Sequence, residues 1–160
     1  MVAVNSTMVE LGSPAPHFEL PDPDGALHSL ESVSGGRPLV VAFVCNHCPY
    51  VKHIGPTFGR VALQLAEIGV SVVAISSKDV VHYPEDAPDK MAIAAKEWGW
   101  EFPYLFDEDQ AVAKAYRAAC TPDLFLYDAE LKLAYRGQFD SSRPRNNDPI
   151  DGSDLRAAAA

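Results

Sequence analysis

Cysteine is scarce in this chain, because its 160 residues include only Cys45, Cys48 and Cys120. Small secreted proteins that rely on disulfides carry more cysteines, in even number and at wider spacing, which argues against a disulfide scaffold. A single tight pair in a cytosolic chain points instead to redox chemistry or to metal binding. We therefore expect a cytoplasmic protein whose cysteines carry out chemistry.

Long apolar runs and an excess of basic residues are also lacking. No run of about eighteen apolar residues occurs, so we expect no membrane span. Residues 1–11 contain neither a basic leader nor an apolar signal core, so we expect no secretory signal. Thirteen basic residues against twenty-two acidic ones give a formal charge of −9. This balance disfavours nucleic acids and anionic membranes as partners, because both need a basic face.

Alternating strand and helix patterns, with 48% hydrophobic residues, predict one α/β domain over residues 1–160. A turn at Asp24-Gly25 predicts an N-terminal hairpin within residues 12–30. Further predicted strands cover 38–44, 70–76, 102–106, 124–127 and 131–135, and predicted helices cover 49–68, 86–98 and 109–118. Residues 141–150 read as a polar loop. Ser153 to Arg156 resembles a capped helix start, and we expect that C-terminal helix to be truncated.

The pair Cys45-Asn46-His47-Cys48 stands between the predicted strand 38–44 and the predicted helix 49–68. Free N–H groups and the dipole at a helix start favour a thiolate. We interpret Cys45 as the nucleophile. We expect Cys48 to lie one turn deeper, to be more buried, and to resolve the mixed disulfide. His47 lies between them and is expected to lower the pKa of the thiolate further.

A metal site is an alternative use of the same cysteines. Cys45 and Cys48 could bind copper or zinc together with His47, His53 or Cys120. Structural zinc sites usually take four ligands from two such pairs, and a second pair is missing here. In a third interpretation, the two cysteines are inert residues of the core. A CxxC beside a βαβ pattern favours redox chemistry, so we predict no bound metal and no organic cofactor, because the sulfurs carry the electrons.

Four segments together resemble the thioredoxin superfamily, and within it the peroxiredoxin-like alkyl hydroperoxide reductase/thiol-specific antioxidant (AhpC/TSA) branch, in a subgroup with a CxxC. They are GSPAPHFELPDPDG, FVCNHCP, YPEDAP and CTPD. The resemblance implies a thioredoxin-like three-layer sandwich, with a mixed central sheet flanked by helices and an N-terminal hairpin extension. It also implies that Thr121-Pro122 is the cis-proline segment, which faces the dithiol and docks the substrate backbone. Cys120 would then be an accessory thiol or a small apolar filler.

Departures from these families narrow the expected activity. The resemblance places Cys45 at the threonine position and Val41 at the proline position of peroxiredoxins, with no arginine near Pro122. That pattern disfavours peroxide activation. In thioredoxin, a buried acid beneath the dithiol accepts the proton of the second cysteine. This acid has no counterpart in residues 39–44, so we expect that proton to leave through water or a histidine. A histidine before the second cysteine is shared with oxidising members, which predicts a pair more oxidising than thioredoxin.

The sequence thus predicts a thiol–disulfide oxidoreductase of cell redox homeostasis. Its partners would be protein or small-molecule thiols and disulfides, and the protein would be a monomer or a weak homodimer. The first alternative is an antioxidant thiol peroxidase with Cys48 peroxidatic and Cys45 resolving. The second is a soft-metal (copper or zinc) binding protein. Arg136 and Arg143 could position an anionic substrate.

Overall fold

A five-stranded mixed sheet forms the centre of the computed structural model, which describes residues 10–118 and 121–137. Its order is β5-β4-β3-β6-β7, with β3, β4 and β5 parallel and with β6 and β7 antiparallel to their neighbours. The strands are β3 (Leu39–Phe43), β4 (Ser71–Ser76), β5 (Tyr104–Phe106), β6 (Asp123–Tyr127) and β7 (Leu133–Gly137). A separate hairpin consists of β1 (Glu19–Pro21) and β2 (Leu27–Ser29). The predicted N-terminal hairpin is confirmed, and the strands predicted at 124–127 and 131–135 pair with each other as β6 and β7.

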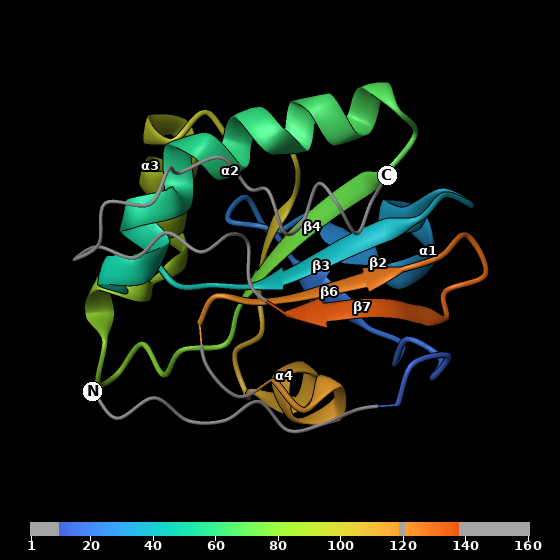
Figure 1. Cartoon of the computed structure of the whole chain (residues 1–160). Helices are drawn as coiled ribbons and strands as arrows, with labels where there is room; N and C mark the ends of the chain where they lie inside the picture. Colours follow the sequence, from blue (N-terminus) through green and yellow to red (C-terminus); the bar gives the residue numbers. More distant parts are fainter. Residues whose placement is uncertain (1–9, 119–120, 138–160) are drawn as a thin grey trace.

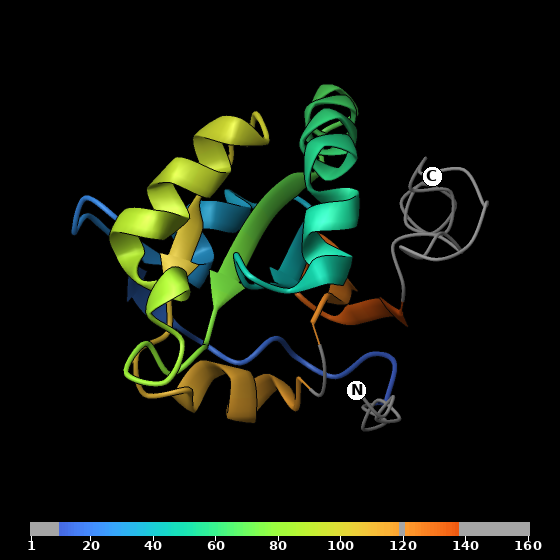
Figure 2. The same ribbon diagram turned by 90° about the vertical axis from the view of Figure 1, so that its left-hand side faces the viewer.

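Helices cover both faces of the sheet (Figures 1 and 2). Successive β3 residues alternate between two hydrophobic clusters, because side chains of a strand point to opposite faces. Val40 and Ala42 pack with α2 (Pro49–Glu67) and α3 (Pro88–Glu97), whereas Leu39, Val41 and Phe43 pack beneath α1 and α4. Helix α1 spans Leu30–Ser34 and α4 spans Ala111–Tyr116. The predicted thioredoxin-like three-layer sandwich with a mixed sheet is confirmed.

Helix α2 changes direction along its length in Figure 1, and it carries Pro56 in its interior. Proline lacks an N–H and crowds the preceding turn, which bends helices. The neighbouring Gly55 lets the Trp98 ring approach closely, since a Cβ there would lie 2.7 Å from the Trp98 Cδ2 atom. Trp100 adds a hydrogen bond of 2.8 Å from its indole nitrogen to the Gly55 carbonyl oxygen. This packing fixes α2 above the sheet and thereby positions its N-terminus.

The predicted helix over 86–98 is wrong at its start. The helix α3 begins at Pro88, and Pro84–Asp86 form a separate short 3-10 turn, η1. Ala87 between them is extended, with φ −62° and ψ 155°. The residue before a proline is pushed out of the helical region, so the helix cannot continue back through Ala87. As a result the Asp86 side chain faces the protein interior instead of capping α3. The short helix α1, with a capping box formed by Ser29 and Ser32, is an element that the sequence reading missed.

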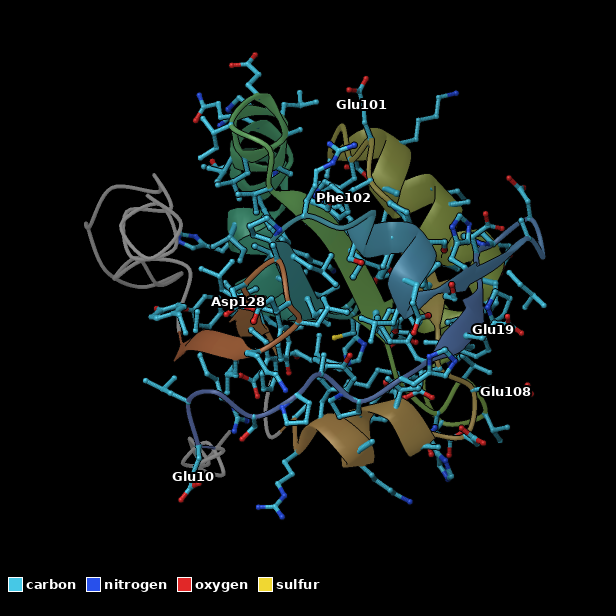
Figure 3. The ribbon with its side chains drawn as sticks, turned by 90° about the vertical axis from the view of Figure 1, so that its right-hand side faces the viewer. Glu10, Glu19, Glu101, Phe102, Glu108 and Asp128 are labelled. Carbon is cyan, nitrogen blue, oxygen red and sulfur yellow. The ribbon has the colours of Figure 1, made fainter. Side chains whose placement is uncertain are left out.

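Exposed acidic side chains occur in several parts of the described structure. Figure 3 shows exposed carboxylates from widely separated segments of the chain: Glu10, Glu19, Glu101, Glu108 and Asp128. Within the described part of the chain, no helix is both long and apolar enough to cross a membrane. Cys120, Arg143, the predicted loop 141–150 and the predicted C-terminal helix lie outside the described residues.

Candidate active site around the dithiol

The dithiol lies where β3 ends and α2 begins. Cys45 follows the strand by two residues, and Cys48 is the N-cap residue of α2, directly before Pro49. Both thiols are free, with exposed fractions of 0% for Cys45 and 8% for Cys48. The expected order of burial is therefore reversed, because Cys45 and not Cys48 is the more buried sulfur. The reason is that the helix begins only after Cys48, which leaves Cys45 on the buried continuation of the central strand.

Thr121-Pro122 faces the two sulfurs. The peptide bond between Thr121 and Pro122 is cis. Phe43 pairs with Asp123 in the antiparallel register of β3 and β6, and continuing this register by two residues brings Cys45 opposite Thr121. The Thr121 hydroxyl lies 3.7 Å from the Cys45 sulfur, and the Thr121 carbonyl oxygen lies 3.7 Å from the Cys48 sulfur. The strand register thus explains how segments 76 positions apart in the chain meet at the dithiol.

The two thiols have opposite acidities. A hydrogen bond from Cys45, with help from the Thr121 side chain and the backbone N–H groups of Tyr50 and Val51, lowers the pKa of Cys48 to about 5 against the opposing effect of burial. The pKa of Cys45 is raised by its hydrogen bond with Cys48 and by burial, with a smaller contribution from the negative charge of Asp86. Helix N-termini stabilise thiolates in this way. The geometry therefore favours Cys48 as the resting thiolate, opposite to the sequence-based assignment, and the His47 ring is not a leading cause of its acidity.

Asp86 lies beneath the CNHC loop and is completely buried. Its Oδ1 accepts hydrogen bonds from the backbone N–H groups of Asn46, at 2.6 Å, and His47, at 3.2 Å. Its Oδ2 is hydrogen-bonded to Nδ1 of the His47 ring. One carboxylate therefore holds both the backbone of the loop and the orientation of its histidine. The sequence reading found no acid in β3 and expected none beneath the dithiol, but the structure supplies one from η1.

Three further contacts complete this network. The Asn46 amide nitrogen donates to the Glu85 carbonyl oxygen at 3.0 Å, and the Tyr104 hydroxyl donates to the Asn46 amide oxygen at 2.9 Å. The Tyr83 ring stacks on the His47 ring with centroids 4.9 Å apart. Each link ties the loop to η1 or to β5, so the residues between the cysteines are held on several sides.

Sheet topology contained a signal for Asp86 that sequence reasoning did not use. Strands β3 and β4 are parallel and adjacent, so the loops after their carboxyl ends meet at the same edge. The CNHC loop follows β3, and the YPEDAP segment follows β4. Sequence reasoning used the motif only for the family resemblance and interpreted Asp86 as the first residue of a helix, so it assigned the motif no role at the site. It assigned none to Asn46 or Tyr104 either.

The site also offers donor types that metals accept. Among the residues the structure describes, the Cys45 sulfur, a ring nitrogen of His47 and a carboxylate oxygen of Asp86 lie within 4.8 Å of one another. Zinc accepts all three donor types. Here, however, the His47 nitrogen and the Asp86 oxygens already satisfy each other and the loop backbone. This hydrogen-bond set fits an organised acid–base network.

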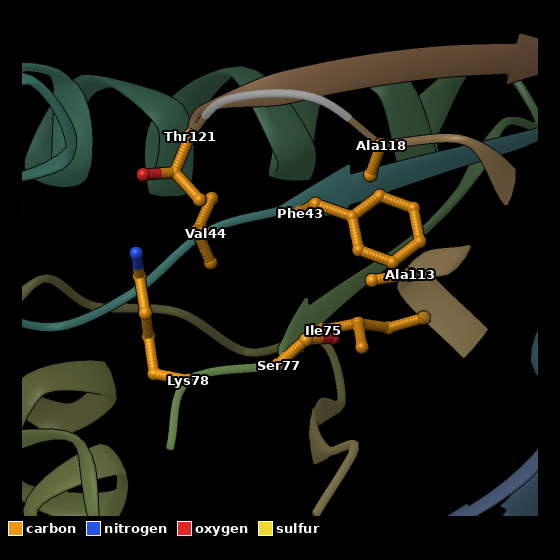
Figure 4. A pocket seen from close by; sticks show the side chains of 8 residues that line it. All are labelled: Phe43, Val44, Ile75, Ser77, Lys78, Ala113, Ala118 and Thr121. Atoms are coloured by element: carbon orange, nitrogen blue, oxygen red, sulfur yellow. The ribbon is translucent and has the colours of Figure 1, made fainter. Parts of the chain in front are cut away.

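A shallow cleft of about 130 Å³ lies beside the dithiol, on the α4 side of Thr121. Figure 4 shows the polar ends of Lys78 and Thr121 on one side of this cleft and the apolar side chains of Phe43 and Ile75 on the other. Because Thr121 also contacts the Cys45 sulfur, the cleft and the dithiol share a wall. A group bound to a disulfide sulfur at the dithiol could extend into this space.

Arg136 lies in β7 and forms an ion pair with the buried Asp123. Its Nη2 is 2.7 Å from Asp123 Oδ2 and also donates to the Arg117 carbonyl oxygen at 2.8 Å. The guanidinium also lies over the Phe125 ring, 4.6 Å from its centroid. This arginine therefore anchors the strand that follows Pro122. In the described part of the chain, no arginine hydrogen-bonds to either sulfur.

Comparisons with known proteins agree with this fold. The chain is 31% identical over 113 residues to a Mycobacterium tuberculosis protein named "Putative peroxiredoxin Rv2521", covering 71% of this chain and 67% of that one. The crystal structure of an uncharacterized conserved protein from Geobacillus kaustophilus is 50% identical, with a TM-score of 0.94 over 98% of this chain and 84% of that one. The thioredoxin domain of a Bacteroides vulgatus thiol-disulfide oxidoreductase shares the fold at 16% identity, with a TM-score of 0.71 over 96% and 100% of the two chains. A model of the AhpC/TSA family matches residues 11–136, so this chain belongs to the AhpC/TSA family, the peroxiredoxin-like branch of the thioredoxin superfamily.

Proposed function

We propose that this protein is a thiol–disulfide oxidoreductase that cycles Cys45 and Cys48 between a dithiol and a disulfide. The observation that carries the proposal is the pair of free, hydrogen-bonded thiols at the start of α2, placed against Thr121. A thiolate at a helix N-terminus with a second thiol beside it is what disulfide exchange requires. Its substrates would be protein or small-molecule disulfides in a reducing cytoplasm. The protein would act as a monomer or a weak homodimer.

In this proposal Cys48 attacks and Cys45 resolves. Cys48 is the more exposed of the two residues and has the lowered pKa, so it supplies the attacking thiolate. Cys45 is fully buried beside it and closes the disulfide in the second step. Thr121-Pro122 would present its backbone to the substrate, as the position of the Thr121 carbonyl next to the Cys48 sulfur suggests. His47, stacked under Tyr83, would orient groups around the pair.

Insulin reduction tests the proposal directly. The Cys120→Ser variant should reduce insulin disulfides at the rate of the parent protein, whereas Cys45→Ser and Cys48→Ser should fall to the background rate. Circular dichroism should show the same fold in all four proteins. Unchanged insulin reduction in Cys48→Ser would overturn the proposal. So would stoichiometric zinc or copper retained through purification with no turnover, since that result indicates a metal-binding protein.

Thiol peroxidase activity is a second candidate, favoured by the family and by the lowered pKa of Cys48. Cys48 would reduce the peroxide and Cys45 would resolve the resulting sulfenic acid as an intramolecular disulfide. Against it, Cys45 occupies the position of the peroxiredoxin threonine, and Arg136 is held by Asp123. Rapid hydrogen-peroxide consumption that is lost in Cys48→Ser and retained in Cys120→Ser would favour this activity over disulfide exchange.

A further inference from the structure

The Cys45 thiol raises a chemical question in the second half of exchange. Once Cys48 holds the substrate in a mixed disulfide, Cys45 must lose its proton before it can attack. Its sulfur has no exposed surface, and its contact with the Thr121 hydroxyl does not supply a base. An acceptor within the protein is therefore needed for this step.

The nearest groups able to accept a proton are His47 and Asp86. A ring nitrogen of His47 and a carboxylate oxygen of Asp86 both lie within 4.8 Å of the Cys45 sulfur. The carboxylate is completely buried, while the His47 side chain keeps 27% of its surface exposed. A proton accepted here thus has a path to solvent through the imidazole, which a buried carboxylate alone would lack.

We propose that Asp86 and His47 form the proton-accepting pair of the Cys45 thiol, with Asp86 as the positioning residue that acts through His47. This inference rests on the proposed disulfide exchange and adds the group that drives its second step. The carboxylate that positions His47 is contributed by the YPEDAP segment after β4, and not by the strand that carries the dithiol. The role of that motif would be to complete the active site.

The atoms balance as follows. The Cys48 thiolate attacks a disulfide R–S–S–R′, forms Cys48–S–S–R and releases R′–S⁻. The Cys45 S–H bond then breaks, its proton passes to the His47–Asp86 pair, and the Cys45 sulfur attacks the Cys48 sulfur. The Cys45–Cys48 bond forms and R–S⁻ leaves, so two electrons have moved from the dithiol to the substrate. The pair finally loses its proton to solvent.

Several other titratable or charged groups lie near the pair. Tyr83 stacks on His47, and the Lys78 ammonium lies 5.6 Å from the centre of the Tyr83 ring. Tyr104 reaches the loop through Asn46, and burial, together with the neighbouring Asp86, raises its pKa well above the ordinary value, which keeps it neutral. The remaining neighbours are Cys48 in the dithiol, Glu85 beside Asp86, and Lys52 and Lys90, which line the surface next to Asn46. None of these has both the proximity to Cys45 and the exposure of His47.

The test separates the two chemical steps. Dithiobis(nitrobenzoate), a chromogenic aromatic disulfide, releases one thiolate when Cys48 attacks and a second when Cys45 resolves. Stopped-flow absorbance therefore resolves both phases in a Cys120→Ser background. In Asp86→Asn the first phase should keep its rate, and the second should slow about 100-fold at neutral pH. The second phase should also require a higher pH to reach half its maximum rate.

Two further variants guard against a purely structural explanation. His47→Asn can still donate a hydrogen bond to Asp86 but cannot carry a proton, so its second phase should slow as well. His47→Gly should slow in the same way and recover on addition of imidazole. Asp107→Asn removes another completely buried carboxylate, whose partners are Ser77, Val112 and Ala113, and should leave both phases unchanged.

The outcomes are distinct. If Asp86 acts only through its negative charge, removing that charge eases formation of the Cys45 thiolate, and the second phase of Asp86→Asn becomes faster. An unchanged or faster second phase in Asp86→Asn would thus overturn the inference while leaving exchange intact. Absence of the first phase in the parent protein would instead refute the proposed exchange itself.

Discussion

Asp86 and Asp107 are two completely buried carboxylates at the same end of the sheet, and they have different surroundings. Among the described residues, the side chain of Asp107 accepts from backbone N–H groups at the start of α4 and from the Ser77 hydroxyl. Asp86 also accepts from backbone N–H groups, but its other partner is an imidazole, and a thiol lies within 4.8 Å. Burial and hydrogen bonding are common to both carboxylates, so these two properties alone indicate only a structural role. Contact with groups that exchange protons is what distinguishes a carboxylate of the active site.

The largest expected effect is a pH dependence of stability, because the titratable thiols lie beside Asp86. The Cys48 pKa falls from its ordinary 9.0 to about 5 on folding, so its contribution to stability is complete above pH 9 and absent below about pH 5. The raised pKa of Cys45 opposes folding only above pH 9. Between pH 5 and 8 the reduced protein should therefore gain at least about 5 °C in Tm relative to Cys48→Ser. Thermal melts of both proteins under reducing conditions measure this difference, and equal pH profiles would contradict the thiolate assignment.

The second effect compares the carboxylates directly. Asp86→Asn and Asp107→Asn should each lower the free energy of unfolding by about 1–3 kcal/mol, because each leaves buried donors without their charged acceptor. Only Asp86→Asn should slow the resolving phase of the reaction with dithiobis(nitrobenzoate). Urea unfolding and stopped-flow absorbance, measured on the same preparations, give the two quantities. A comparable slowing of the resolving phase in Asp107→Asn would remove the distinction between the two sites.

The smallest expected effect concerns Tyr104, which reaches the CNHC loop through Asn46. Tyr104→Phe removes the donor to the Asn46 amide oxygen and should cost about 1 kcal/mol of stability. Asp86 keeps its own contacts with the loop in this variant, so the resolving phase with dithiobis(nitrobenzoate) should stay within about threefold of the parent rate. A loss as large as that of Asp86→Asn would mean that the Tyr104–Asn46 link, and not the carboxylate, organises the loop.

The sequence was sufficient for the layers of the fold and for the dithiol, because both depend on local patterns. The apolar runs around Val41 and Val73 predict buried strands, and the CxxC between a strand and a helix predicts a redox pair. The order of burial of the two sulfurs could not be read in this way, because it depends on where α2 starts relative to Cys48. Asp86 was missed because its position depends on the parallel pairing of β3 and β4, which brings together two loops that are far apart in the chain.

The reversed burial of the two cysteines also determines which variant would capture physiological partners. Covalent complexes between an exchanger and its target accumulate when the attacking sulfur is kept and the sulfur that releases the target is removed. In this molecule the second cysteine of the motif, Cys48, keeps 8% of its surface exposed, and the first, Cys45, is fully enclosed. The Cys45→Ser protein is therefore the bait that should retain disulfide-linked partners in cells, and Cys48→Ser is the matched blank.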